Sequence, residues 1–157
     1  TDKHYFHLNN FLSRLQKIFK KIVIISIHPK YDLKFVQKKF KKFKVVKYQT
    51  KKLVQNSFLI TDFGSSSIID GLILNKNIIS LFSPYIEYEN NVYSKVLKLH
   101  DYDITSNKNL DKKNILSISK KNKKNYSKYL NSKHYIRKNN YGFKTIILEI
   151  NKLFRLI

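Results

Sequence analysis

The sequence predicts an α/β domain with a doubly wound, mostly parallel sheet of about five strands and helices on both faces. Three observations predict it. Short apolar runs alternate with amphipathic segments four times over in the first half of the chain, with short connections between them. Residues 22–27 form an apolar run rich in β-branched side chains, which is typical of a strand covered on both faces. The apolar fraction of 42% over 157 residues suffices for one folded domain, residues 1–157, with a core.

The first elements are a helix, a strand and a second helix. The first helix is predicted by apolar residues at three- and four-residue spacing, namely Leu8, Phe11, Leu12, Leu15, Ile18 and Phe19, and it ends at Lys20 and Lys21. The strand at residues 22–27 stops before Pro29, because proline cannot continue a central ladder. A second helix follows, with an apolar face made of Leu33, Val36, Phe40 and Phe43.

The middle of the chain continues the alternation. We expect a strand at residues 44–48, a short helix at 50–55, a strand at 58–62, a helix at 66–75 and a strand at 78–82. Beyond Pro84 we expect a loop, an edge strand at residues 96–99 and an irregular stretch at 101–114. A thin apolar stripe predicts a helix within residues 117–140, and a closing amphipathic helix starts at Phe143.

The charge of the chain invites a nucleic-acid interpretation, but its composition weakens it. The formal net charge is +22, yet Arg, the residue favoured for bidentate phosphate and base contacts, occurs only at Arg14, Arg137 and Arg155. The accompanying wealth of Asn, Ile, Tyr and Phe is typical of an AT-rich coding sequence, so we assign about half of the charge to solvated faces. The remainder suits peripheral contact with an anionic membrane, at about 1 kcal/mol per clustered Lys.

Other classes lack their signatures. No run approaches the roughly 20 apolar residues of a membrane span, and no secretory signal is recognisable at the start. Without Cys there are no disulfides or thiolate metal sites. The five His residues show no metal-ligand spacing, so we expect no metal and no cofactor. Because the chain begins at Thr1 and contains no Met, we expect it to be a fragment of a larger two-domain protein.

The most informative stretch joins a predicted strand to a helix through Gly64-Ser65-Ser66-Ser67, which we call the serine turn. Such a turn presents backbone N–H groups and hydroxyls at the positive end of a helix, which suits a phosphate. The alternative is a Ser N-cap in an ordinary strand-to-helix turn. His28 and Lys30 follow another strand, so in a single parallel sheet they would share the rim of the serine turn and converge on one anion. The alternatives are a half-exposed histidine and one of many surface lysines.

Further candidates lie nearby. Asp70, one turn inside the helix, is placed to accept hydrogen bonds from ribose hydroxyls, or else is a surface carboxylate paired with a Lys. Gly71 is unusual inside a helix and indicates close backbone approach to the sheet or to a ligand. Gln49 and Thr50, after the second strand, could meet a nucleobase edge. No dinucleotide or P-loop phosphate motif is present, and no nucleophile elbow surrounds Ser66.

These motifs resemble the C-terminal, donor-binding half of two-domain GT-B glycosyltransferases. The resemblance is to bacterial capsule, teichoic-acid and sialyl- or polysialyltransferases with a His-Pro and a Ser-Ser motif. It rests on His28-Pro29 and on Leu-Ile-Thr-Asp-Phe-Gly-Ser-Ser-Ser-x-x-Asp-Gly-x-x-x-Asn-Lys-Asn-Ile-Ile, within residues 22–81. Asp70 takes the acidic position of the second motif, and Asn75 replaces its usual Gly, which a left-handed helix end tolerates.

The resemblance implies a Rossmann-like domain that binds a nucleotide-activated sugar or glycerol donor. In it His28 acts in catalysis, His28 and the serine turn hold the donor phosphate, and Asp70 touches the ribose. The expected protein is a cytoplasmic transferase of surface-polysaccharide assembly, peripheral to the inner face of the plasma membrane. The N-terminal half that binds acceptor and supplies the base is missing, so we expect this fragment alone to be inactive. The alternatives are a non-catalytic basic module for nucleic acid or anionic membrane, and a nucleotide-sugar epimerase-like domain.

Overall fold

The computed structural model describes residues 1–86, 92–106 and 110–131. Within these ranges the elements follow one another as α1 (Asp2–Phe19), β1 (Ile24–Ile27), α2 (Leu33–Lys39), β2 (Lys44–Lys47), α3 (Thr50–Asn56), β3 (Leu59–Asp62), α4 (Ser67–Ile73), β4 (Asn77–Phe82), α5 (Val92–Val96), β5 (Asp101–Asp103) and α6 (Lys112–Leu130). The predicted α/β class is confirmed, and the elements expected up to β4 are all present, although α1 begins six residues before the first apolar residue of its predicted face. The expectation that the first strand is covered on both faces was wrong, because Ile22 precedes β1 with 83% of its surface exposed and Ile24 is 40% exposed.

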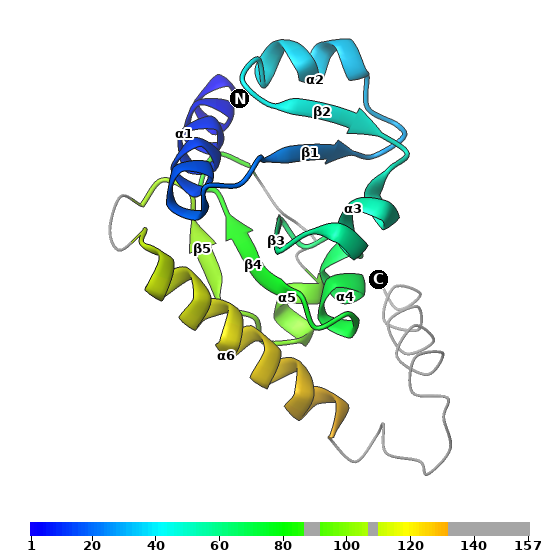
Figure 1. Cartoon of the computed structure of the whole chain (residues 1–157), viewed down its shortest axis with the longest axis vertical. Helices are drawn as coiled ribbons and strands as arrows, with labels where there is room; N and C mark the ends of the chain where they lie inside the picture. Colours follow the sequence, from blue (N-terminus) through cyan, green and yellow to red (C-terminus); the bar gives the residue numbers. More distant parts are fainter. Residues whose placement is uncertain (87–91, 107–109, 132–157) are drawn as a thin grey trace.

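The strands form two parallel sheets in place of the one that we expected. β1 pairs with β2, and β3, β4 and β5 form a second sheet in that order. Figure 1 shows β1 and β2 running across the molecule toward the right of the view, whereas β4 points toward α1. The described strands therefore do not share one carboxyl edge.

Helices cover both faces of the three-stranded sheet, and successive residues of β4 contribute to two different cores. Ile79 and Leu81 belong to the core that α1 helps to build, which also includes Ile27 and Val45 of the two-stranded sheet. Ile78 belongs to the core beneath α4, together with Ile60. Because side chains alternate between the faces of a strand, this pattern makes β4 the wall between the two cores.

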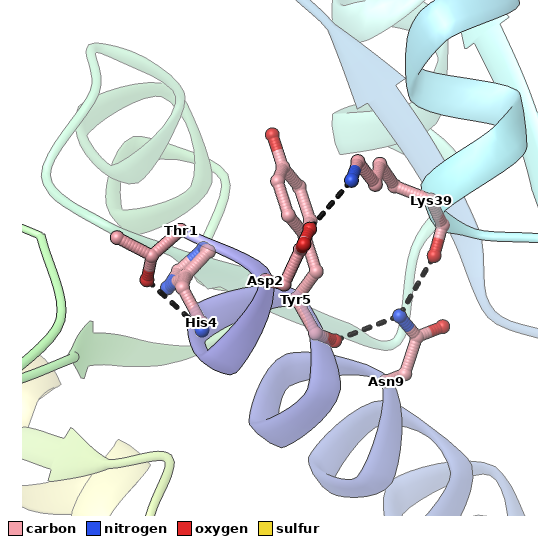
Figure 2. A network of polar contacts seen from close by, with 6 residues as sticks. All are labelled: Thr1, Asp2, His4, Tyr5, Asn9 and Lys39. Atoms are coloured by element: carbon pink, nitrogen blue, oxygen red, sulfur yellow. Dashed lines mark hydrogen bonds and ion pairs between the residues drawn. The ribbon is translucent and has the colours of Figure 1, made fainter.

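Polar contacts fix the start of α1 against its neighbours (Figure 2). The side-chain amide of Asn9 donates to the carbonyl oxygens of Tyr5, at 2.7 Å, and of Lys39, at 2.9 Å, and so ties α1 to the end of α2. The Lys39 ammonium forms an ion pair of 2.6 Å with Asp2 in the first turn of α1. That hydrogen-bonded cation lowers the pKa of the Asp2 carboxyl.

Two buried side chains of α6 complete β4 where its neighbour β5 has not yet begun. β5 joins the ladder at Ser80. Before that point, the backbone N–H of Ile78 donates to Ser119 Oγ at 3.1 Å, and the Ile78 carbonyl accepts from Asn122 Nδ2 at 3.3 Å. Asn122 Oδ1 also accepts from the His100 N–H at 2.7 Å. These two residues, both without exposed surface, therefore satisfy backbone groups that an apolar helix face would leave unpaired.

Two predictions between Pro84 and α6 were wrong, whereas the loop expected around residues 87–91 lies outside the described residues. The expected edge strand at residues 96–99 is instead the last residue of α5 and the turn that follows it: the Leu99 N–H donates to the Ser94 carbonyl, and Lys98 takes a positive φ of 50°. Leu97 and Leu99 pack in the core beneath α4. Their alternating apolar pattern reflects this burial and not a strand. The edge strand is instead β5, inside the stretch 101–114 that we expected to be irregular. The closing helix expected from Phe143 lies outside the described residues.

Candidate functional site

The serine turn connects the end of β3 to α4, as the sequence predicts. Gly64 has a φ of 99°, a conformation that residues with a side chain rarely adopt. Glycine therefore lets the chain reverse at this point at low cost in free energy. The preceding Phe63 ring lies 5.4 Å from the ring of His4, which fastens the turn to the start of α1. Ser65 and Ser66 are exposed, and Ser67 is buried as the first residue of α4.

The donors of the turn converge on the carboxylate of Asp62, the last residue of β3. Asp62 Oδ1 accepts from the Ser65 N–H at 2.8 Å, and Oδ2 accepts from the Ser65 hydroxyl at 2.6 Å and from the Ser67 hydroxyl. The Ser65 and Ser67 hydroxyl oxygens are also 2.7 Å apart. The turn therefore binds the Asp62 carboxylate. The two carboxylate oxygens are negatively charged, as phosphate oxygens are.

Ser66 and Asp70 stay available to solvent at the start of α4. Ser66 occupies the N-cap position without making a side-chain cap bond, so it does not fulfil the alternative of a Ser N-cap; Ser65 Oγ instead accepts from the Ser67 N–H at 3.3 Å. The side chain of Asp70 is exposed one turn further along. Gly71 allows close approach to the sheet, because a Cβ at this position would lie 2.7 Å from Ile60 Cδ1 and closer still to Ile78 Cδ1. Asn75 takes the predicted left-handed conformation, with φ 53°.

The loop after β1 carries His28 and Lys30, both exposed. His28 Nδ1 accepts a hydrogen bond of 3.2 Å from the backbone N–H of Lys30. In the neutral imidazole the proton is then on Nε2, which leaves a donor directed away from the loop backbone. The ring also forms an edge contact with Tyr31, with centroids 6.4 Å apart.

Gln49 and Thr50 are exposed at the start of α3. The Thr50 hydroxyl lies 2.6 Å from the Ser26 hydroxyl of β1, so α3 is tied to the first sheet. Gln49 precedes the helix without a side-chain cap bond. Thr50 thus lies beside β1, the strand that leads into the loop of His28, while α3 also packs against α4.

Within the described residues, no hydrogen bond, ion pair or ring contact joins His28 or Lys30 to the serine turn. The two motifs follow strands of different sheets, and Figure 1 shows that these sheets end in different directions. The structure therefore groups Asp62 with Ser65 and Ser67, and it groups His28 with Lys30. That both groups face one anion stays a prediction.

Two features of this rim were not predicted from the sequence. Asp62 lay within the quoted motif, but only the folded turn shows that its carboxylate is the acceptor for the serines. His4 is buried between α1 and the end of β4, where its Nδ1 lies 3.0 Å from the Ser83 hydroxyl. Burial, aided by the positive N-terminal amino group, lowers the pKa of His4 to about 4. Its place on the apolar face of α1, four residues before Leu8, was the available signal.

The described part of the chain contains no cluster of three or more His, Cys, Asp or Glu residues that could hold a metal ion. Nor does it contain a helix that is both long and apolar enough to traverse a bilayer. Comparisons of the chain with protein-family models, with curated proteins and with solved structures found no match.

Proposed function

We propose that the chain is the donor-nucleotide domain of a GT-B-type glycosyltransferase, or of a CDP-glycerol-type transferase, in bacterial surface-polysaccharide assembly. The observation that carries the proposal is the serine turn at the carboxyl end of β3, whose N–H and hydroxyl groups already converge on one oxyanion, the Asp62 carboxylate. Ligands of parallel α/β domains bind beyond the carboxyl ends of strands. The order of the His-Pro and Ser-Ser motifs, in a parallel α/β fold, supports the same assignment.

In this proposal the donor phosphate is held by the exposed side of the turn. Ser66, which caps no helix N–H, supplies a hydroxyl, and a phosphate oxygen competes with Asp62 for the donors of Ser65. The His28 Nε2–H and the Lys30 ammonium stabilise the charge of the leaving phosphate as the glycosidic bond breaks, which is preorganised electrostatic catalysis. In the two-domain enzyme that this proposal implies, a second domain brings the acceptor and the base, so the chain by itself should bind nucleotide without turnover.

The first experiment titrates CMP, CDP and UDP into the chain and follows the backbone amide shifts. We expect perturbation of residues 64–67 and of His28. Ser66→Ala removes one exposed hydroxyl and should weaken binding, whereas Ser117→Ala, an equally exposed serine on α6, should not. If nucleotide shifts spread over the lysine faces and are insensitive to Ser66→Ala, the phosphate assignment is wrong.

The second experiment addresses His28 in the intact two-domain enzyme that the proposal implies. Replacing His28 by Ala removes the Nε2–H donor but no buried contact, since the ring is exposed. We expect a fall in kcat of about 100-fold, the usual scale for a lost transition-state donor, with an unchanged thermal midpoint. Unchanged kinetics would count against this assignment.

A basic module that binds an anionic surface is the second candidate, because one segment supports it specifically. Residues 30–52 contain ten Lys and a single acidic residue, Asp32. The same segment exposes three aromatic rings: Tyr31 at 62%, Phe35 at 51% and Tyr48 at 76%. Exposed aromatics among lysines are typical of proteins that lie on anionic membranes. This candidate predicts salt-dependent sedimentation with anionic vesicles that is insensitive to Ser66→Ala.

A further inference from the structure

Three polar residues lie in one row across the three-stranded sheet: the last residue of β3, a residue inside β4 and the first residue of β5. Asp62 of β3 is in register with Ser80 of β4, and Ser80 is in register with Asp101 of β5. Residues in register on parallel strands point to the same face, and neighbouring strands are about 4.8 Å apart. The row therefore places a serine between two carboxylates whose strands are about 10 Å apart.

The central residue of this row has an unsatisfied hydroxyl. Ser80 has no exposed surface, and its Oγ has no hydrogen-bond partner within the part of the chain that the structure describes. The buried Ser119, by comparison, bonds the Ile78 N–H and the Asn77 side chain. A buried hydroxyl without a partner costs stability, and an apolar residue of similar size would avoid that cost.

The flanking carboxylates bond to hydroxyl and N–H groups and not to cations. Among the residues that the structure describes, Asp62 accepts from Ser65 and Ser67, and Asp101 Oδ1 accepts from the Ser94 hydroxyl at 2.7 Å. Neither forms an ion pair within the described residues, although the chain carries 32 Lys and Arg. An ionised carboxylate offers about four acceptor positions, so both carboxylates keep capacity for further donors.

We propose that the Asp62–Ser80–Asp101 row is a subsite for neighbouring hydroxyl groups of a sugar ring. Sugar hydroxyls are both donors and acceptors, so they can donate to the carboxylates and satisfy the Ser80 hydroxyl. To reach Ser80, the sugar ring displaces some of the hydrogen bonds that Ser65, Ser67 and Ser94 now donate to the two carboxylates. This inference rests on the proposed function, because Asp62 is shared with the serine turn and a donor phosphate there would bring its ribose or its transferred sugar to the row.

The row can be tested without phosphate. We titrate the full chain with D-ribose, with D-glucose and, separately, with inorganic phosphate, and follow the amide shifts. We expect ribose, glucose or both to perturb Ser80, Ser94 and Asp101, and the stronger of the two identifies the part of the donor that binds. Asp101→Asn, which keeps the shape but halves the acceptor strength, should weaken these shifts.

Ser80→Ala provides the sharper readout, because the proposal predicts opposite effects on stability and binding. Removing the unsatisfied hydroxyl should leave the urea midpoint equal or higher, while sugar binding becomes about tenfold weaker, the value of one good hydrogen bond. The matched control, Ser119→Ala, removes a satisfied buried hydroxyl and should lower the midpoint. Equal sugar binding by Ser80→Ala, or a midpoint as low as that of the control, would refute the subsite.

The outcomes also separate this inference from the proposed function. If neither sugar perturbs the row of the wild-type chain, the subsite is refuted whatever phosphate does. If Mg²⁺ alone shifts these residues and the sugars do not, the row is a cation site and the inference is equally refuted. If phosphate fails to perturb residues 64–67, the donor-phosphate assignment is refuted, and the sugar titration still tests the Asp62–Ser80–Asp101 row independently.

Discussion

Replacing Asn122 by Ala should destabilise the fold far more than its place on a lysine-rich helix would indicate. The side chain has no exposed surface and bonds the N–H of His100, at 2.7 Å, and the carbonyl of Ile78, at 3.3 Å. The change leaves a buried carbonyl and a partly buried N–H unpaired, each at about 1–3 kcal/mol. Adding the lost packing and allowing for water at His100, we expect a loss of about 2–4 kcal/mol in the free energy of unfolding.

The measurement is urea unfolding followed by circular dichroism, with Asn125→Ala as the matched control. Asn125 lies three residues along the same helix and donates to the Lys98 carbonyl at 2.6 Å, but this bond is exposed. Water can replace it, so the control should lose less than about 1 kcal/mol. Asn122→Asp keeps the acceptor for His100 and loses the donor to Ile78. If Asn122→Ala costs no more than the control, α6 does not complete the sheet in the way described.

Three further predictions concern the fold around the serine turn. Gly71→Ala places a methyl against the buried Ile60 and Ile78 side chains, so overpacking should outweigh the gain in helix propensity of about 1 kcal/mol and lower the urea midpoint. Gly64→Ala forces a side chain into φ 99° and should cost about 1–2 kcal/mol, measured in the same way. The pKa of His4 falls from 6.5 in the unfolded chain to about 4 in the folded one, so its contribution is complete above pH 6.5 and is lost as the pH falls toward about 4. His4→Gln should flatten this part of the stability profile, and an unchanged profile would contradict the assignment.

Much of the fold could be predicted because its signals are local. The run at residues 22–27, the helix spacing before Phe19 and the turn at Gly64 each depend on residues within a few positions of one another. β5 could not be predicted in this way. It is only three residues long and carries two aspartates, and its place in the sheet depends on pairing with Ser80 and Phe82, about 20 positions earlier. Leu97 and Leu99 led to a wrong strand prediction, because the chain at a helix end can bury alternate residues as a strand does.

The candidate site likewise combines features that local sequence patterns predict with features that depend on long-range packing. Sequence patterns alone predicted that the serine turn follows a strand, that the backbone at Gly71 approaches the sheet or a ligand closely, and that Asn75 ends a helix, because backbone sterics and side-chain period act over short distances. Three features depend on long-range packing: Asp62 accepts the hydrogen bonds of the serines, Asp62 is in register with Ser80 and Ser80 with Asp101, and β1 and β3 belong to different sheets. Parallel strands are joined through helices and not by hairpin turns, so their register and sheet membership are set by how the helices pack.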